Sequence, residues 1–129
     1  MGFFDLLFGL QKRSFGSVRG ETQDKIRLDW ENIKILLNQK GPSQLRQALI
    51  TADKSLDNAL KDMVVGENMG ERLKNAKDMF PWDLYQKIWE AHKLRNNIVH
   101  ESNFEPLYFM VTEAITNIQS GLTSLGLKV

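Results

Sequence analysis

The chain has 129 residues, a length that fits one domain with a real hydrophobic core. Its 17 basic and 16 acidic residues leave a formal charge of +1, so nucleic acid or acidic lipid would have to be bound by a local patch. The absence of cysteine excludes disulfides, thiolate metal ligands and a cysteine nucleophile, and we expect a reducing, cytoplasmic location.

The opening stretch MGFFDLLFGL is almost entirely apolar and is followed by Lys12, Arg13 and Arg19. It is too short to cross a bilayer, and no basic residue precedes it, unlike in a signal peptide. Three interpretations stay open for residues 2–10: packing on the domain or a partner subunit, contact with a membrane surface, or disorder. We divide the chain into an apolar segment with a basic linker, residues 1–20, and a helical domain, residues 21–129.

After the linker, the apolar residues repeat with the period of an α-helix. A first helix is predicted over residues 22–40, with one apolar stripe formed by Ile26, Trp30, Ile33 and Leu37. Gly41 is expected to cap its end, and Ser43 to cap a second helix, rich in Ala and Leu, that runs to Gly66.

Three more helices are predicted in the second half of the chain. A short helix over residues 68–80 is closed by Pro81, a long one runs from about Trp82 to about His100, and a last one follows the break at residues 102–106. No segment alternates with the period of a strand. The sequence therefore predicts an all-α, antiparallel bundle of four or five helices.

Arg95 lies on the apolar face of the long helix that ends near His100. At about 100° per residue, an arc of roughly 140° centred near Arg95 holds the aliphatic side chains: Leu84, Ile88, Ala91, Leu94, Ile98 and Val99. A buried guanidinium keeps its charge, so a carboxylate, a carbonyl or a ligand phosphate should face it. The candidate carboxylates are those of Asp53, Asp57, Asp62 and Glu113.

A second stripe of the same helix, offset by about 100°, contains Tyr85, Trp89, Asn96 and His100, with His92 between the two stripes. A histidine at a helix end is often only a cap of the last carbonyl groups. Arg95 and His100 lie about 140° apart around the helix, so both contact one phosphodiester only near the helix end or across a subunit boundary. His92 and His100 alone supply too few ligands for a zinc site. We therefore expect neither a metal nor a cofactor.

The stretch Arg95-Asn96-Asn97-Ile98-Val99-His100 resembles the motif of the HEPN superfamily: arginine, polar residue, three variable residues, histidine. The setting is similar too, because the motif lies late in the penultimate long helix of a predicted bundle. The likeness extends over about residues 22–124. It implies a HEPN-like helical bundle that acts as a homodimeric, metal-independent endoribonuclease, for example a toxin or defence effector with an antitoxin partner.

The resemblance also implies roles for the motif residues. His100 would act as general base or acid, Arg95 would stabilise charge on the phosphate, and Asn96 would orient one of them. RNA carries its own nucleophile, the ribose 2′-hydroxyl, so no serine, cysteine or metal is needed.

Four further residues of the long helix are predicted to bind substrate: Lys87, Lys93, Tyr85 and Trp89. The lysines would contact phosphate, with Arg72, Lys74 and Lys77 extending the basic surface, or would form only a solvated face. The aromatic pair would stack on bases or form the seam of the dimer.

The sequence departs from one HEPN subtype, and it leaves an alternative function open. Toxins of this family that are paired with a nucleotidyltransferase antitoxin commonly carry a tyrosine two residues after the histidine, where this chain has Ser102, which argues against that subtype. The alternative function is a non-catalytic HEPN-like interaction or dimerisation module. In that case Arg95 is a structural ion pair, and the Phe-rich residues 2–10 dock on a partner or a membrane.

Overall fold

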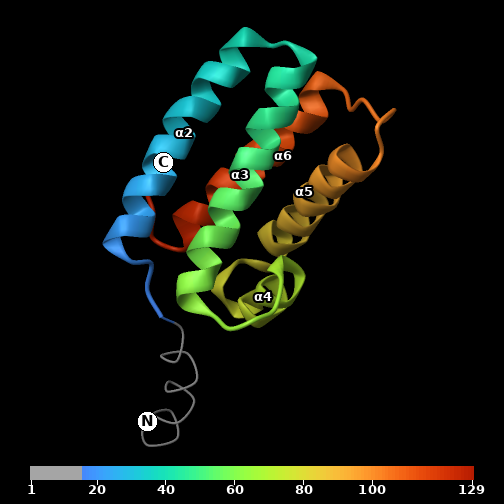
Figure 1. Cartoon of the computed structure of the whole chain (residues 1–129). Coiled ribbons are helices and arrows are strands. Elements are labelled where there is room, and N and C mark those ends of the chain that lie inside the picture. The colour runs from blue at the N-terminus through green and yellow to red at the C-terminus, as the bar shows by residue number, and fades with distance from the viewer. Residues whose placement is uncertain (1–15) are drawn as a thin grey trace, which may run out of the picture.

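A computed structural model describes residues 16–129, which form five α-helices and one 3-10 turn with no strand. The elements are α2 (Gly20–Gln39), α3 (Pro42–Met63), α4 (Met69–Asn75), η1 (Lys77–Met79), α5 (Trp82–His100) and α6 (Tyr108–Ser124). The helices pack antiparallel (Figure 1), which confirms the predicted fold class. The apolar segment 2–10 and the predictions made for it lie outside the described residues.

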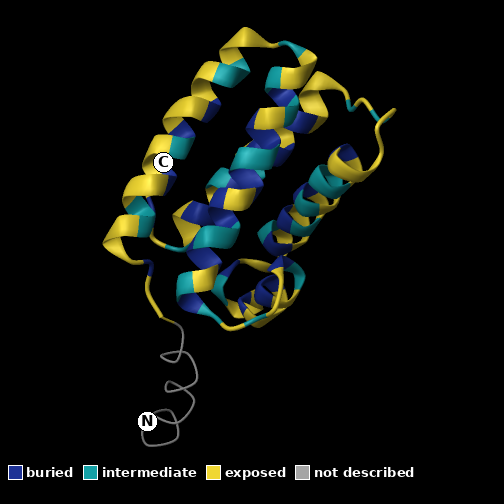
Figure 2. Ribbon diagram, in the orientation of Figure 1, coloured by how far each residue is buried: buried dark blue, intermediate teal, exposed yellow. Residues whose placement is uncertain are grey.

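Helix α3 holds the bundle together, because α2, α4, α5 and α6 all pack against it (Figure 1). The faces that the helices turn towards one another are buried, and the outer faces are exposed (Figure 2). Each large aliphatic side chain buried there stabilises the fold by about 1.5–3 kcal/mol; the fully buried ones include Ile26, Ile33, Leu49, Leu56, Leu60, Ile88, Ile118 and Leu122. Among residues 16–129, no helix is long and apolar enough to cross a membrane.

The turn between α2 and α3 differs from the sequence prediction. Lys40, with φ 61°, is the left-handed residue that ends α2, and Gly41 is the extended N-cap of α3, so the capping roles predicted for Gly41 and Ser43 were wrong. The reason is Pro42. A proline fits the first turn of a helix, where its missing N–H has no partner to lose, and it forces the preceding residue into an extended backbone.

Arg46 of α3 fixes the end of α5. Its Nη1 donates to the Ile98 carbonyl at 2.7 Å, and its Nη2 donates to the Phe104 carbonyl at 3.2 Å. The Ile98 carbonyl belongs to the last turn of α5, where carbonyl groups have no partner within the helix. This guanidinium therefore ties both the helix end that carries His100 and the following loop to the centre of the bundle.

We expect Arg46→Met to lower the free energy of unfolding by about 2 kcal/mol, because hydrogen bonds from a charged donor to two carbonyl groups are lost. Gln47→Met is the matched control, since Gln47 is the exposed neighbour on α3 and its side chain donates to Thr51 of the same helix. Urea denaturation measures both variants. Equal stability of the two variants would contradict the role given to Arg46.

Candidate functional site

A groove of about 660 Å³ runs between α3 and α5, and the start of α4 also lines it. Four cationic and two acidic side chains line it, so its charge favours an anion. We call it the α3–α5 groove; the lining residues that matter below are Asp53, Lys54, Asp57, Lys61, Trp89, His92, Lys93, Arg95 and Asn96.

Arg95 lines this groove beside a carboxylate that does not use up the hydrogen-bond donors of its guanidinium. Its Nε lies 3.6 Å from Asp53 Oδ2, which is too far for a hydrogen bond, and its Nη1 donates to Asn96 Oδ1 at 2.9 Å. Nε is buried and has no hydrogen-bond partner within residues 16–129. A guanidinium has five N–H donors, and the Arg95 side chain is 30% exposed. Arg95 therefore keeps donors for an anionic ligand.

Asp53 is the buried centre of the site. Only 3% of the residue is exposed, and both of its carboxylate oxygens lie within hydrogen-bond distance of His92 Nδ1, at 3.0 and 3.1 Å. The same carboxylate faces the guanidinium of Arg95. Of the four carboxylates considered from the sequence, Asp53 is thus the one beside Arg95.

Sequence reasoning did not select Asp53 and His92 as functional residues. One signal was present: Asp53 follows Ala52 within the apolar stripe of α3, between Leu49 and Leu56, where an unpaired carboxylate would be costly. Its partner lies 39 positions away on another helix. Only the packing of α5 on α3 identifies that partner.

The residues predicted from the motif and its helix fall in different places. Asn96, Lys93 and Trp89 line the groove together with Arg95. His100 is exposed at the end of α5 and is not among the residues that line the groove. Five residues of helix separate it from Arg95, about 7.5 Å along the axis. Within one chain, His100 thus lies outside the groove that Arg95 lines.

Tyr85 lies inside an aromatic cluster. Only 7% of it is exposed, and its ring centroid lies 5.9 Å from that of Trp82 and 6.4 Å from those of Phe80 and Trp89. In this fold Tyr85 supports the neighbouring rings, and Trp89 is the aromatic residue of the predicted pair that reaches the groove.

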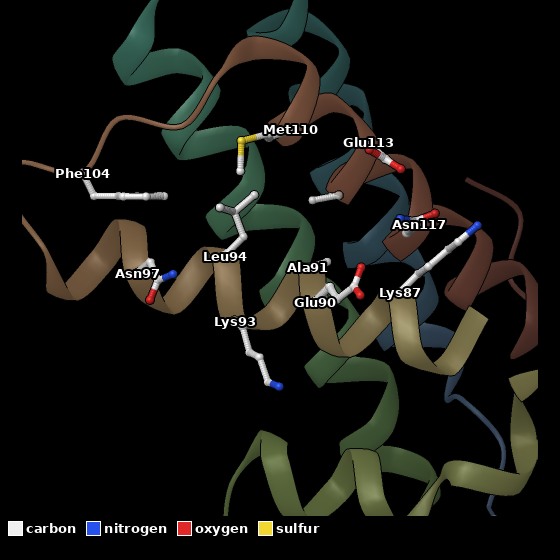
Figure 3. Close-up of a pocket in the computed structure, with 11 residues that line it drawn as sticks. Lys87, Glu90, Ala91, Lys93, Leu94, Asn97, Phe104, Met110, Glu113 and Asn117 are labelled. Atoms are coloured by element: carbon white, nitrogen blue, oxygen red, sulfur yellow. The ribbon is translucent and has the colours of Figure 1, made fainter. Parts of the chain in front are cut away.

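Lys87 faces a second hollow, of about 330 Å³, between α5 and α6 (Figure 3). Its floor is apolar and includes Leu94, Phe104 and Met110, and its rim carries charges of both signs. Lys93, which also borders this hollow, extends away from Met110 and Leu94 (Figure 3). Both predicted lysines thus border the α5–α6 hollow, and Lys93 alone of the two also lines the α3–α5 groove.

Arg72 has a structural role in place of the phosphate contact considered for it. Its Nε and Nη2 donate to the two oxygens of Asp57 at 2.7 and 3.0 Å, and Nη1 donates to the Gly66 carbonyl at 2.7 Å. Hydrogen bonding to Asp57 raises the pKa of Arg72, although burial opposes this. Because Arg72 also occupies the Asp57 carboxylate, Asp57 adds little repulsion towards an anion in the groove.

Comparison with protein-family models, with curated proteins and with solved structures finds no match for this chain. The site is therefore interpreted from its own residues and geometry.

The two arginines should differ in their effect on stability. Arg72→Met leaves Asp57 without its buried partner and should lower the free energy of unfolding by about 3 kcal/mol or more. Arg95→Met should cost less than about 1 kcal/mol, because its pair is long and partly exposed and His92 still bonds Asp53. Thermal and urea unfolding of the two variants measures this difference. A loss at Arg95 as large as that at Arg72 would identify Arg95 as a structural ion pair.

Proposed function

We propose that this protein is a HEPN-like endoribonuclease that acts without a metal ion and as a homodimer, with Arg95, Asn96 and His100 in its site. The observation that carries the proposal is Arg95 itself. Its guanidinium is held at a groove with excess positive charge, yet within residues 16–129 it makes one side-chain hydrogen bond and only a long contact with Asp53. Such a group can bind a phosphate without first breaking a strong ion pair.

The remaining groove residues fit a nucleotide. Lys54, Lys61 and Lys93 offer further positive charge for phosphates, and Trp89 offers a ring on which a base can stack. Arg95 would stabilise the charge that develops on the phosphate during cleavage, and its bond to Asn96 keeps the guanidinium in place. His100 would exchange the proton of the attacking or the leaving oxygen.

A second copy of the chain is needed because Arg95 and His100 diverge within one chain. His100 ends α5, and the apolar residues at the start of α6 lie just beyond the loop that follows. Of these, Leu107 is 60% and Phe109 61% exposed. Packing two such ends together would cover this apolar surface and bring His100 of one copy towards the groove of the other.

The same exposed residues favour a second candidate function, a non-catalytic interaction or dimerisation module. In that case residues 107–110 bind a partner protein, and Arg95 only accompanies Asp53. We also propose a toxin or defence role with an antitoxin partner for the ribonuclease, and membrane contact through residues 2–10 for the interaction module.

Purified wild-type protein should cleave RNA, and Arg95→Gln and His100→Gln should each lower the rate by about 10² or more, because each removes a group that acts on the phosphate or its proton. Arg27→Gln is the matched control, since Arg27 is an exposed arginine on α2. Cleavage is followed on a labelled oligoribonucleotide. Unchanged rates in both variants would reject the assignment.

The composite site makes a stricter prediction. If Arg95→Gln and His100→Gln chains are refolded together, half of the dimers should be mixed, and each mixed dimer has one intact site. The mixture should then recover about a quarter of the wild-type rate. No recovery would show that the two residues do not act across a subunit boundary.

A further inference from the structure

We infer that His92, oriented by Asp53, is a catalytic residue of the same groove and takes the proton from the ribose 2′-hydroxyl of bound RNA. The inference rests on the proposed ribonuclease function and adds to it a residue outside the Arg95–His100 motif. It follows from three observations: the position of His92 beside Arg95, the nitrogen that Asp53 engages, and the charge of the surrounding groove.

His92 and Arg95 share one face of α5, because they are three residues apart. They also share a carboxylate: His92 Nδ1 lies 3.0 Å from Asp53 Oδ2, and Arg95 Nε lies 3.6 Å from the same oxygen. Both side chains also line the α3–α5 groove, so an anion held there by the exposed part of the Arg95 guanidinium is within reach of the His92 imidazole. Within a single chain, His100 has no such position.

The contact with Asp53 decides which nitrogen of His92 is free. A carboxylate only accepts hydrogen bonds, so Nδ1 carries the proton and Nε2 of the neutral ring is an acceptor. Nε2 makes no hydrogen bond within residues 16–129. The His92 side chain is partly exposed and lines the α3–α5 groove.

The groups around His92 are arranged for an anionic substrate. Lys54, Lys61 and Lys93 line the same groove, while the Asp57 carboxylate is already occupied by Arg72. The ring of Trp89 meets the His92 ring edge to face at 6.0 Å, which keeps the imidazole in its orientation. A carboxylate behind the ring also stabilises the imidazolium that forms when Nε2 accepts a proton.

The proposed step is an intramolecular transesterification, in which the phosphate is transferred from the 5′ oxygen to the neighbouring 2′ oxygen. Nε2 of His92 accepts the proton of the 2′-hydroxyl, the 2′ oxygen forms a bond to phosphorus, and the bond from phosphorus to the 5′ oxygen breaks. The leaving 5′ oxygen takes a proton from His100 of the second copy or from water, and His92 returns its proton to solvent. The products are a 2′,3′-cyclic phosphate and a 5′-hydroxyl end, so no outside reactant is consumed.

The experiment measures single-turnover cleavage of an oligoribonucleotide by the full chain and, separately, binding of its 2′-O-methyl copy, which cannot be cleaved. His92→Gln should lower the cleavage rate by about 10² or more and change binding by less than about threefold, because glutamine cannot transfer a proton. Arg95→Gln should weaken both. Glu90→Gln is the matched control, since Glu90 is exposed on α5 and lies outside the α3–α5 groove.

Rescue by added imidazole distinguishes a catalytic role of His92 from a purely structural one. Imidazole in solution should restore part of the cleavage rate of His92→Ala, because it can occupy the vacated space and accept the proton. Cleavage by His92→Gln within about threefold of wild type, or no rescue of His92→Ala, would overturn the inference and leave the ribonuclease function standing. Failure of the wild type to cleave any RNA would instead refute the proposed function, and the His92 step with it.

Discussion

The site depends on one buried carboxylate. Asp53 lies in the apolar stripe of α3, and an isolated carboxylate there would cost several kcal/mol. His92 of α5, which lies within hydrogen-bond distance of both oxygens, offsets most of that cost, and the longer contact with Arg95 adds a smaller part. Because both partners come from one helix face, the contact with Asp53 acts together with the buried apolar side chains of α5 to set which face of α5 turns towards α3. The orientation of the groove and of the donors along it follows from this contact.

The charges near the groove are divided between structural and available groups. Asp57 and Arg72 satisfy each other with two short hydrogen bonds and hold the end of α3 to α4. Asp53 is instead shared by two cationic or polar partners, and one of them, Arg95, contacts it only at 3.6 Å. The Asp57–Arg72 pair thus uses its hydrogen-bonding groups within the fold, whereas Arg95 beside Asp53 keeps donors unused. This difference is expected if Arg95 binds a ligand. We interpret the groove as an anion site on that basis.

The fold could be predicted from the sequence because helical periods of apolar residues and the three prolines mark every helix between residues 22 and 124. The motif led to Arg95 and Asn96, which the structure places together. A helical wheel gives the angle of a side chain but not which neighbour covers it, so the burial of Tyr85 and the turning of Lys87 towards α6 were not foreseen. The contact of Asp53 with His92 depends on tertiary packing alone.

The most direct test of the account is whether an anion binds in the α3–α5 groove at both Arg95 and His92. Nuclear magnetic resonance of the side-chain nitrogens, Nε of Arg95 and the ring nitrogens of His92, can be followed while a 2′-O-methyl dinucleotide or inorganic phosphate is added. The account predicts that both sets of signals move together and saturate at the same concentration. Signals that stay fixed while the dinucleotide binds elsewhere, or does not bind, would contradict it.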